Sequence, residues 1–225
     1  MSALDACVML LSWTRRAGPL SRRTALLAGL TAAILPRLAR AAPTGGAAQF
    51  ITEIGQRALG LLRATGTAPP RQEIAALLDE AVDLPLLARL VLGRHWSRAS
   101  EEERTEYLAL FRAYALQGLT SALSGYTGHE QFRVTGIRPA GDGDSLVGTS
   151  IVAGEGRPTS QIDWRVREGP EGFVIVDVVA EGVSLLVTNR AEFDSIVSRS
   201  GIDGLLREMR SWYVEAGGDP AEVRG

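Results

Sequence analysis

The residues of this chain that are able to do chemistry are few and form no catalytic motif. His95 and His129 are the two histidines, Cys7 is the one cysteine, and all 24 basic residues are arginine. The absence of lysine excludes Schiff-base chemistry on lysine and a phosphate-binding loop that depends on one. Two histidines and one cysteine are also too few for a Cys/His zinc site or a disulfide framework. We therefore expect no metal, no cofactor and no enzymatic activity.

Asp177 is the sharpest candidate for a functional side chain, because it interrupts the apolar run from Phe173 to Ala180. A carboxylate buried within a strand is costly unless it is paired or hydrogen-bonded. The structural hypothesis pairs it with an arginine such as Arg165, or with a backbone amide. The catalytic hypothesis makes it the base of a small cone-shaped α+β enzyme, beside Tyr126 or Asp163. We favour the structural hypothesis.

The other polar candidates are weaker. His95 precedes Trp96 directly after a helix end and is either a general base or, as we prefer, a polar cap or surface residue. His129 lies in a polar loop and is a weaker candidate for a functional residue than His95. Asp142 and Asp144 resemble a calcium loop only in their first ligands, so we interpret them as turn residues.

The first forty residues have the plan of an export signal. A basic region is followed by an apolar stretch from Ala25 to Leu35, which is too short to span a bilayer, and then by small residues. Arg22 and Arg23 stand directly before the apolar stretch, as in substrates of the twin-arginine translocase. We predict a signal peptide over residues 1–41, cleaved after Ala41.

Cleavage at this point changes the charge of the chain. It removes six of the 24 arginines and one of the 26 acidic residues, which leaves a formal charge of −7. An acidic surface argues against binding to nucleic acid and against lasting adhesion to anionic headgroups. Cys7 is removed as well, so the mature protein folds in an oxidising compartment without a disulfide.

Periodicity predicts that helices come first in the mature chain. Apolar residues recur at helical spacing from Gly45 to about Ala64, and again around residues 74–81. Asp83 and Pro85 mark the start of a third helix that Gly93 ends. Ser100 and Glu103 form a capping box in front of a long helix that reaches Leu123. Two short helices are expected later, at residues 191–198 and 203–212.

Alternating residues and glycine-rich turns predict four strands after the long helix. They cover residues 131–138, with a bulge at Gly136, then 145–153, 160–167 and 173–180, and we expect the last to be central and covered on both sides. The order of elements predicts an α+β fold in which a helical layer packs on a twisted, mainly antiparallel, four-stranded sheet. We place this single domain at residues 42–213 and a flexible tail at residues 214–225.

An ordered set of segments, rather than one motif, carries a family resemblance. In chain order they are VDLPLLARLVLGRHW (82–96), SEEER (100–104), the step from Phe111 to Tyr114, SGY (124–126), IDWRV (162–166), IVDVVAEGVS (175–184) and RAEF (190–193). Behind an export signal, this set resembles the MlaC-like, or toluene-tolerance, family of periplasmic phospholipid-binding proteins in the Mla lipid-asymmetry pathway. The resemblance runs from about Phe50 to Trp212.

The resemblance implies a periplasmic carrier with an apolar cavity for the acyl tails of a phospholipid. It also implies transient exchange with an inner-membrane ABC transporter that carries an MCE-domain protein, and with an outer-membrane lipoprotein complex. A related branch is associated with hopanoid loci, so a polycyclic lipid is the alternative cargo. From the apolar faces of the predicted helices and strands, we nominate as lipid-binding residues Leu87, Val91, Trp96, Phe111, Tyr114, Ile151, Trp164, Val166, Ile175 and Val179. Packing in a filled core is an equally good interpretation of each.

Overall fold

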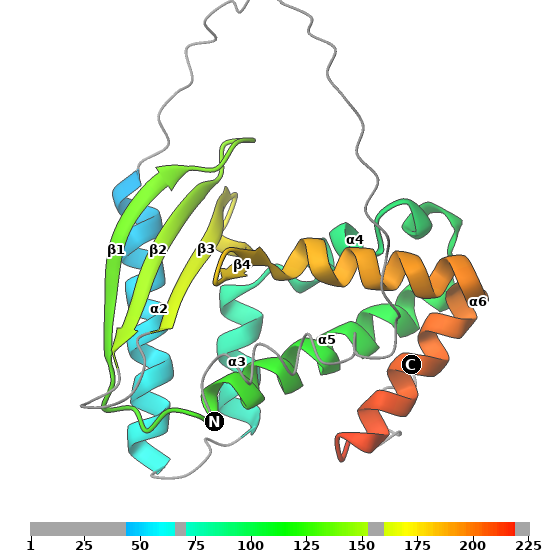
Figure 1. Cartoon of the computed structure of the whole chain (residues 1–225), viewed down its shortest axis with the longest axis horizontal. Coiled ribbons are helices and arrows are strands. Elements are labelled where there is room, and N and C mark those ends of the chain that lie inside the picture. The colour runs from blue at the N-terminus through cyan, green and yellow to red at the C-terminus, as the bar shows by residue number, and fades with distance from the viewer. Residues whose placement is uncertain (1–43, 66–70, 153–159, 219–225) are drawn as a thin grey trace, which may run out of the picture.

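The computed structural model describes residues 44–65, 71–152 and 160–218. The predicted signal peptide lies outside these ranges, as do residues 219–225. The described helices, shown in Figure 1, are α2 (Thr44–Thr65), α3 (Arg71–Ala81), α4 (Leu84–Leu92), the 3-10 helix η2 (Gly93–Arg98), α5 (Glu101–Leu123) and α6 (Leu185–Glu215).

Two helices begin at the caps that the sequence predicts. The Asp83 side chain accepts a hydrogen bond from the backbone N–H of Leu86 at 2.9 Å, which fixes the start of α4. At α5 the Ser100 hydroxyl accepts from the Glu103 N–H, and the Glu103 carboxylate accepts from the Ser100 N–H. These bonds satisfy donors that the first turn of a helix leaves unpaired, so both predictions are confirmed.

The strands form one antiparallel sheet in the order β1-β2-β3-β4-β5. Their bounds are β1 (Gln131–Pro139), β2 (Ser145–Val152), β3 (Ser160–Gly169), β4 (Gly172–Ala180) and β5 (Val183–Ser184). The four predicted strands are present, and the two-residue β5 is an addition to them. The register of β1 and β2 shifts between Val134 and Gly136, so the predicted bulge is confirmed.

β4 departs from the prediction in two ways. It is not central, because only the short β5 separates it from the edge of the sheet. Its pairing with β3 also skips a residue: Asp177 pairs with Arg165, but Ile175 rather than Val176 pairs with Val166. Such a bulge reverses the alternation beyond it. Val178, not Val179, therefore shares the face of Ile175.

The C-terminal helical region also differs from the prediction. The expected helices at residues 191–198 and 203–212 belong to one element, α6, which begins at Leu185 and bends at Gly201. Gly201 has φ 72° and ψ 179°, a conformation that glycine adopts without strain. The two limbs of α6 therefore change direction at this residue, as Figure 1 shows. α6 ends at Glu215, within the range in which the sequence predicts a tail.

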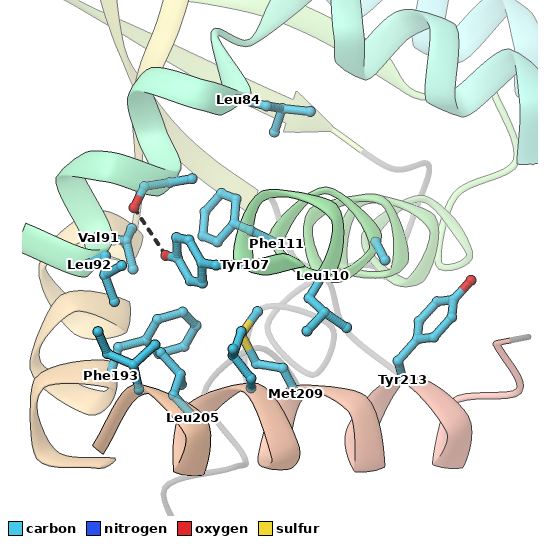
Figure 2. Close-up of a cluster of buried hydrophobic side chains, with 14 of the residues drawn as sticks. Leu84, Val91, Leu92, Tyr107, Leu110, Phe111, Phe193, Leu205, Met209 and Tyr213 are labelled. Atoms are coloured by element: carbon cyan, nitrogen blue, oxygen red, sulfur yellow. Dashed lines mark hydrogen bonds between the residues drawn. The ribbon is translucent and has the colours of Figure 1, made fainter. Parts of the chain in front are cut away.

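The elements pack around two hydrophobic cores. α2 lies across the sheet and contacts β1 to β4, with a core of Ala47, Ile51, Ala81, Val147, Val166 and Ile175. α4, α5 and α6 gather beside the sheet in Figure 1 and enclose the second core. At its centre, drawn in Figure 2, Tyr107 is fully buried and its hydroxyl donates to the Ala88 carbonyl at 3.0 Å. The Tyr107 ring lies 5.8 Å from that of Phe111 and 6.2 Å from that of Phe193.

Candidate functional site

A cavity of about 300 Å³ lies where the two cores meet. α2 and the sheet form one side of its wall, and α3, α4, α5 and the start of α6 form the other. Ile51 and Ile175 come to the wall from the core under α2, while Leu84 and Phe111 come from the helical core. Its volume is at the lower end of the range of about 300–1,000 Å³ that is typical of small-molecule sites.

Small residues on two helices of the wall leave this space unfilled. α2 contributes Ala58, and α5 contributes Ala115, Gly118 and Ala122, whereas Gly55 of α2 packs closely against the Phe132 ring. The three α5 residues are spaced three and four apart, so they lie on one face of the helix. Leucine or phenylalanine at these positions would project into the cavity.

Several polar groups of the wall are already hydrogen-bonded to the protein. The Tyr114 hydroxyl donates to Asn189 Oδ1 at 3.1 Å, and the Trp164 indole N–H donates to the Thr149 hydroxyl at 2.8 Å. Burial, together with the nearby Glu192 carboxyl, raises the pKa of Tyr114, so this hydroxyl stays neutral. A wall of this kind suits alkyl chains better than a polar ligand.

Asp177 is a structural junction at the edge of the wall. Its Oδ1 accepts from the backbone N–H groups of Val178 and Leu186, at 2.8 and 3.0 Å, and its Oδ2 accepts from the Ser184 hydroxyl at 2.6 Å. The carboxylate thus ties β4 to β5 and to the first turn of α6. Although Asp177 lies opposite Arg165 in the register of β3 and β4, the predicted ion pair between the two side chains is not found, because Arg165 binds Asp144 instead.

The histidines lie away from the cavity wall. His95 is buried in η2, and its Nε2 lies 2.8 Å from Oδ1 of Asp194, which also binds Arg94. His129 is exposed in the loop before β1. Tyr126 does line the cavity, whereas Asp163 pairs with Arg138 outside it.

Asp142 and Asp144 lie in the turn between β1 and β2. The turn is closed by the Ala140 N–H, which donates to the Asp144 carbonyl, and by the Asp144 N–H, which donates to the Gly141 carbonyl. The buried Asp144 carboxylate binds both Arg165 and Arg167 of β3. Burial disfavours its charged form, but the two guanidinium groups outweigh burial and hold the pKa of Asp144 below its usual value.

Seven of the ten nominated residues line the cavity: Leu87, Val91, Phe111, Tyr114, Ile151, Trp164 and Ile175. The other three, Trp96, Val166 and Val179, are not among the residues of the cavity wall. Trp96 packs against Tyr107, with the guanidinium groups of Arg89 and Arg104 over its ring. Val166 is buried in the core under α2, and Val179 faces away because of the bulge in β4.

Sequence reasoning missed the contribution of α2 and of the start of α6. Ile54, Ala58, Leu186 and Asn189 all line the cavity. The apolar stripe of α2 was visible in the sequence, but its periodicity alone cannot distinguish a cavity wall from a filled core.

The described parts of the chain hold no group of three or more His, Cys, Asp or Glu residues arranged to bind a metal ion. Within the same residues, no helix combines the length and the hydropathy that crossing a membrane requires.

Three comparisons relate this chain to known proteins. A family model described as MlaC protein matches residues 62–211. The intermembrane phospholipid transport system binding protein MlaC of Haemophilus influenzae is 24% identical over 132 residues, which are 57% of this chain and 61% of that protein. The alignment therefore spans less than two thirds of that relative. A phospholipid-binding protein from Ralstonia solanacearum, solved in complex with a phospholipid, has the same fold, with a TM-score of 0.66 and 20% identity. The match covers 76% of this chain and 98% of that structure.

Proposed function

The chain belongs to the MlaC family, and from this premise we propose that it carries a phospholipid, whose acyl tails lie in the cavity, between two membranes. The observation that carries the proposal is the apolar cavity between the two cores. The names of the Haemophilus and Ralstonia relatives, which refer to phospholipid transport and binding, support it.

The physical requirement on such a carrier is the shielding of methylene groups from water. At about 0.8 kcal/mol per methylene, two tails of ~15 methylenes each represent roughly 25 kcal/mol against free passage through water. A closed apolar space removes most of this barrier and needs no catalytic group. The headgroup would stay outside, so we expect weak selectivity for it.

We place the protein in the periplasm, to which the predicted twin-arginine signal over residues 1–41 would direct it. There it would receive or deliver lipid at an inner-membrane ABC transporter with an MCE-domain protein and at an outer-membrane lipoprotein complex. Contacts with these complexes would be transient, in keeping with a predicted mature charge of −7.

Native extraction tests the proposal. The protein is purified from its own periplasm without detergent, extracted with organic solvent and analysed by mass spectrometry. We expect about one phospholipid per chain, with mixed headgroups. A polycyclic lipid in its place would support the alternative cargo, and a protein that carries no lipid would contradict the carrier function.

The catalytic hypothesis for Asp177 has a separate test. The three hydrogen bonds of its carboxylate make it a structural residue, and replacement by asparagine keeps the shape but loses one acceptor. We expect Asp177→Asn to lower stability and to leave the extracted lipid unchanged. Loss of a measured turnover in a folded Asp177→Asn protein would instead support an enzyme.

A further inference from the structure

A second, much smaller pocket lies behind the lipid cavity, between the two limbs of α6 and α5. Its volume is about 20 Å³, and aromatic and aliphatic side chains line it, among them Tyr114, Phe193 and Trp212. Glu192 on the first limb of α6 brings a carboxyl group into this apolar setting. The bend at Gly201 is what places the second limb opposite it.

One oxygen of the half-buried Glu192 carboxyl, Oε1, is buried and lacks a hydrogen-bond partner in the described part of the chain. The titratable groups set near it are Glu208, from the second limb, and the Tyr114 hydroxyl, from α5. Neither can neutralise a carboxylate. Burial, with a smaller contribution from the charge of Glu208, raises the pKa of Glu192 to about 7.

Tyr114 connects this pocket to the lipid cavity. Its side chain lines both spaces, and its hydroxyl donates to Asn189, one turn before Glu192 on α6. Its ring lies 5.0 Å from that of Trp212 on the second limb. A change in the separation of the two limbs therefore reaches the cavity wall through Tyr114 and Asn189.

We propose that Glu192 is a proton-controlled latch that sets how firmly α6 closes the wall of the lipid cavity. With the carboxyl protonated, the limbs pack against Tyr114 and the wall is closed. When the carboxyl ionises, the unpaired charge and its repulsion from Glu208 push the limbs apart, and lipid enters and leaves more readily. The effect on lipid rests on the proposed carrier function, whereas the movement of α6 does not.

The direction of the pH effect follows from the raised pKa. The closed packing is fully favoured below the ordinary glutamate value of 4.5 and is lost as the pH rises through about 7. Lipid should therefore be held more firmly at pH 6 than at pH 8.

The first test measures α6 directly, by amide hydrogen exchange of the purified chain at pH 6 and pH 8, corrected for intrinsic exchange rates. Glu192→Gln keeps the side chain neutral at both values, and Glu215→Gln at the end of α6 is the matched control. We expect protection in α6 to fall about tenfold from pH 6 to pH 8 in the wild type and in the control, a figure reduced for partial exposure of the carboxyl. Glu192→Gln should stay protected. Equal behaviour of Glu192→Gln and wild type would overturn the latch.

The second test measures lipid release, using a phospholipid with a fluorescent acyl tail and acceptor vesicles of phosphatidylcholine, whose charge is constant over this pH range. The rate should rise about threefold or more from pH 6 to pH 8 in the wild type and stay flat in Glu192→Gln. If Glu192→Gln changed the hydrogen exchange of α6 but left the pH dependence of lipid release unchanged, the coupling between the latch and the cavity would be overturned. A protein that takes up no lipid at either pH would contradict the carrier function instead, and hydrogen exchange would then decide the latch alone.

Discussion

The helical core and the lipid cavity are built from the same kinds of residues, but side chains fill the core and leave the cavity open. Around Tyr107, rings from α5 and α6 interlock and leave Leu205 with no exposed surface. Around the cavity, the neighbouring stripe of α5 presents Ala115 and Gly118 to open space. The difference lies in side-chain size along one helix rather than in hydropathy. One face of a single helix can therefore pack in a core while a neighbouring face forms the wall of a cavity.

The comparison predicts very different costs for the same truncation in the two regions. Leu205→Ala should lower the free energy of unfolding by about 3–4 kcal/mol, because it leaves a void in a filled core. Leu119→Ala on the cavity wall should cost only about 1 kcal/mol, because that side chain already faces space. Denaturant unfolding of the lipid-free proteins measures both. Equal losses would show that the cavity is filled in solution.

Enlargement should also cost more stability in the core than at the cavity, but at the cavity it should impair lipid uptake. Ala113 and Ala115 are two residues apart on α5, the first buried in the helical core and the second on the cavity wall. Ala113→Phe should overpack the core and cost about 3 kcal/mol. Ala115→Phe should change stability by less than about 1 kcal/mol and lower lipid uptake about tenfold, because the ring occupies the place of an acyl tail. Unfolding curves and uptake of fluorescent phospholipid give the two values, and an Ala115→Phe protein that loads normally would place the lipid elsewhere.

Low pH should weaken the sheet, through Asp144, more than it weakens the helical core. Asp144 holds Arg165 and Arg167, and its lowered pKa means that this stabilisation is present above the ordinary value of 3.8 and is lost as the pH falls below it. At neutral pH, Asp144→Asn should cost about 2 kcal/mol, and the variant should lose less stability than the wild type on acidification. Stability measured from pH 6 to pH 2 tests this. Parallel curves for the two proteins would rule out Asp144 as the titrating group.

The smallest effect concerns the Tyr107 hydroxyl at the centre of the helical core. Tyr107→Phe keeps the ring packing but removes the hydrogen bond to the Ala88 carbonyl. We expect a loss of about 1 kcal/mol in the free energy of unfolding and no change in lipid uptake. A large drop in uptake would show that the core and the cavity are less independent than their packing indicates.

Local signals in the sequence were sufficient for most of the fold. The capping box at Ser100, the cap at Asp83 and the alternation along β3 each act within a few residues, so they can be predicted without tertiary information. The continuation of α6 through Gly201 could not be predicted in this way, because a glycine is compatible both with a helix end and with a bend.

The cavity itself was harder to predict than the fold around it. Apolar periodicity finds the residues that avoid water, but a core and a cavity share that property, and only distances between elements separate them. Trp96 illustrates this limit of prediction from periodicity, because its ring packs against Tyr107 and against two arginine side chains from α4 and α5 rather than facing the cavity. The membership of the chain in the MlaC family is what gave the cavity its interpretation.

The bulge in β4 also sets the pattern that a chemical mapping of the cargo would produce. A photoreactive amino acid placed at each position of β4 in turn would not label bound lipid at every second residue. Labelling would occur at Ile175, Asp177, Val178 and Ala180, and would be absent at Val176 and Val179. When relatives are aligned across this strand, positions beyond the bulge keep their orientation only if the extra residue is kept. A one-residue deletion there would exchange the cavity-facing and outward-facing side chains at the end of β4.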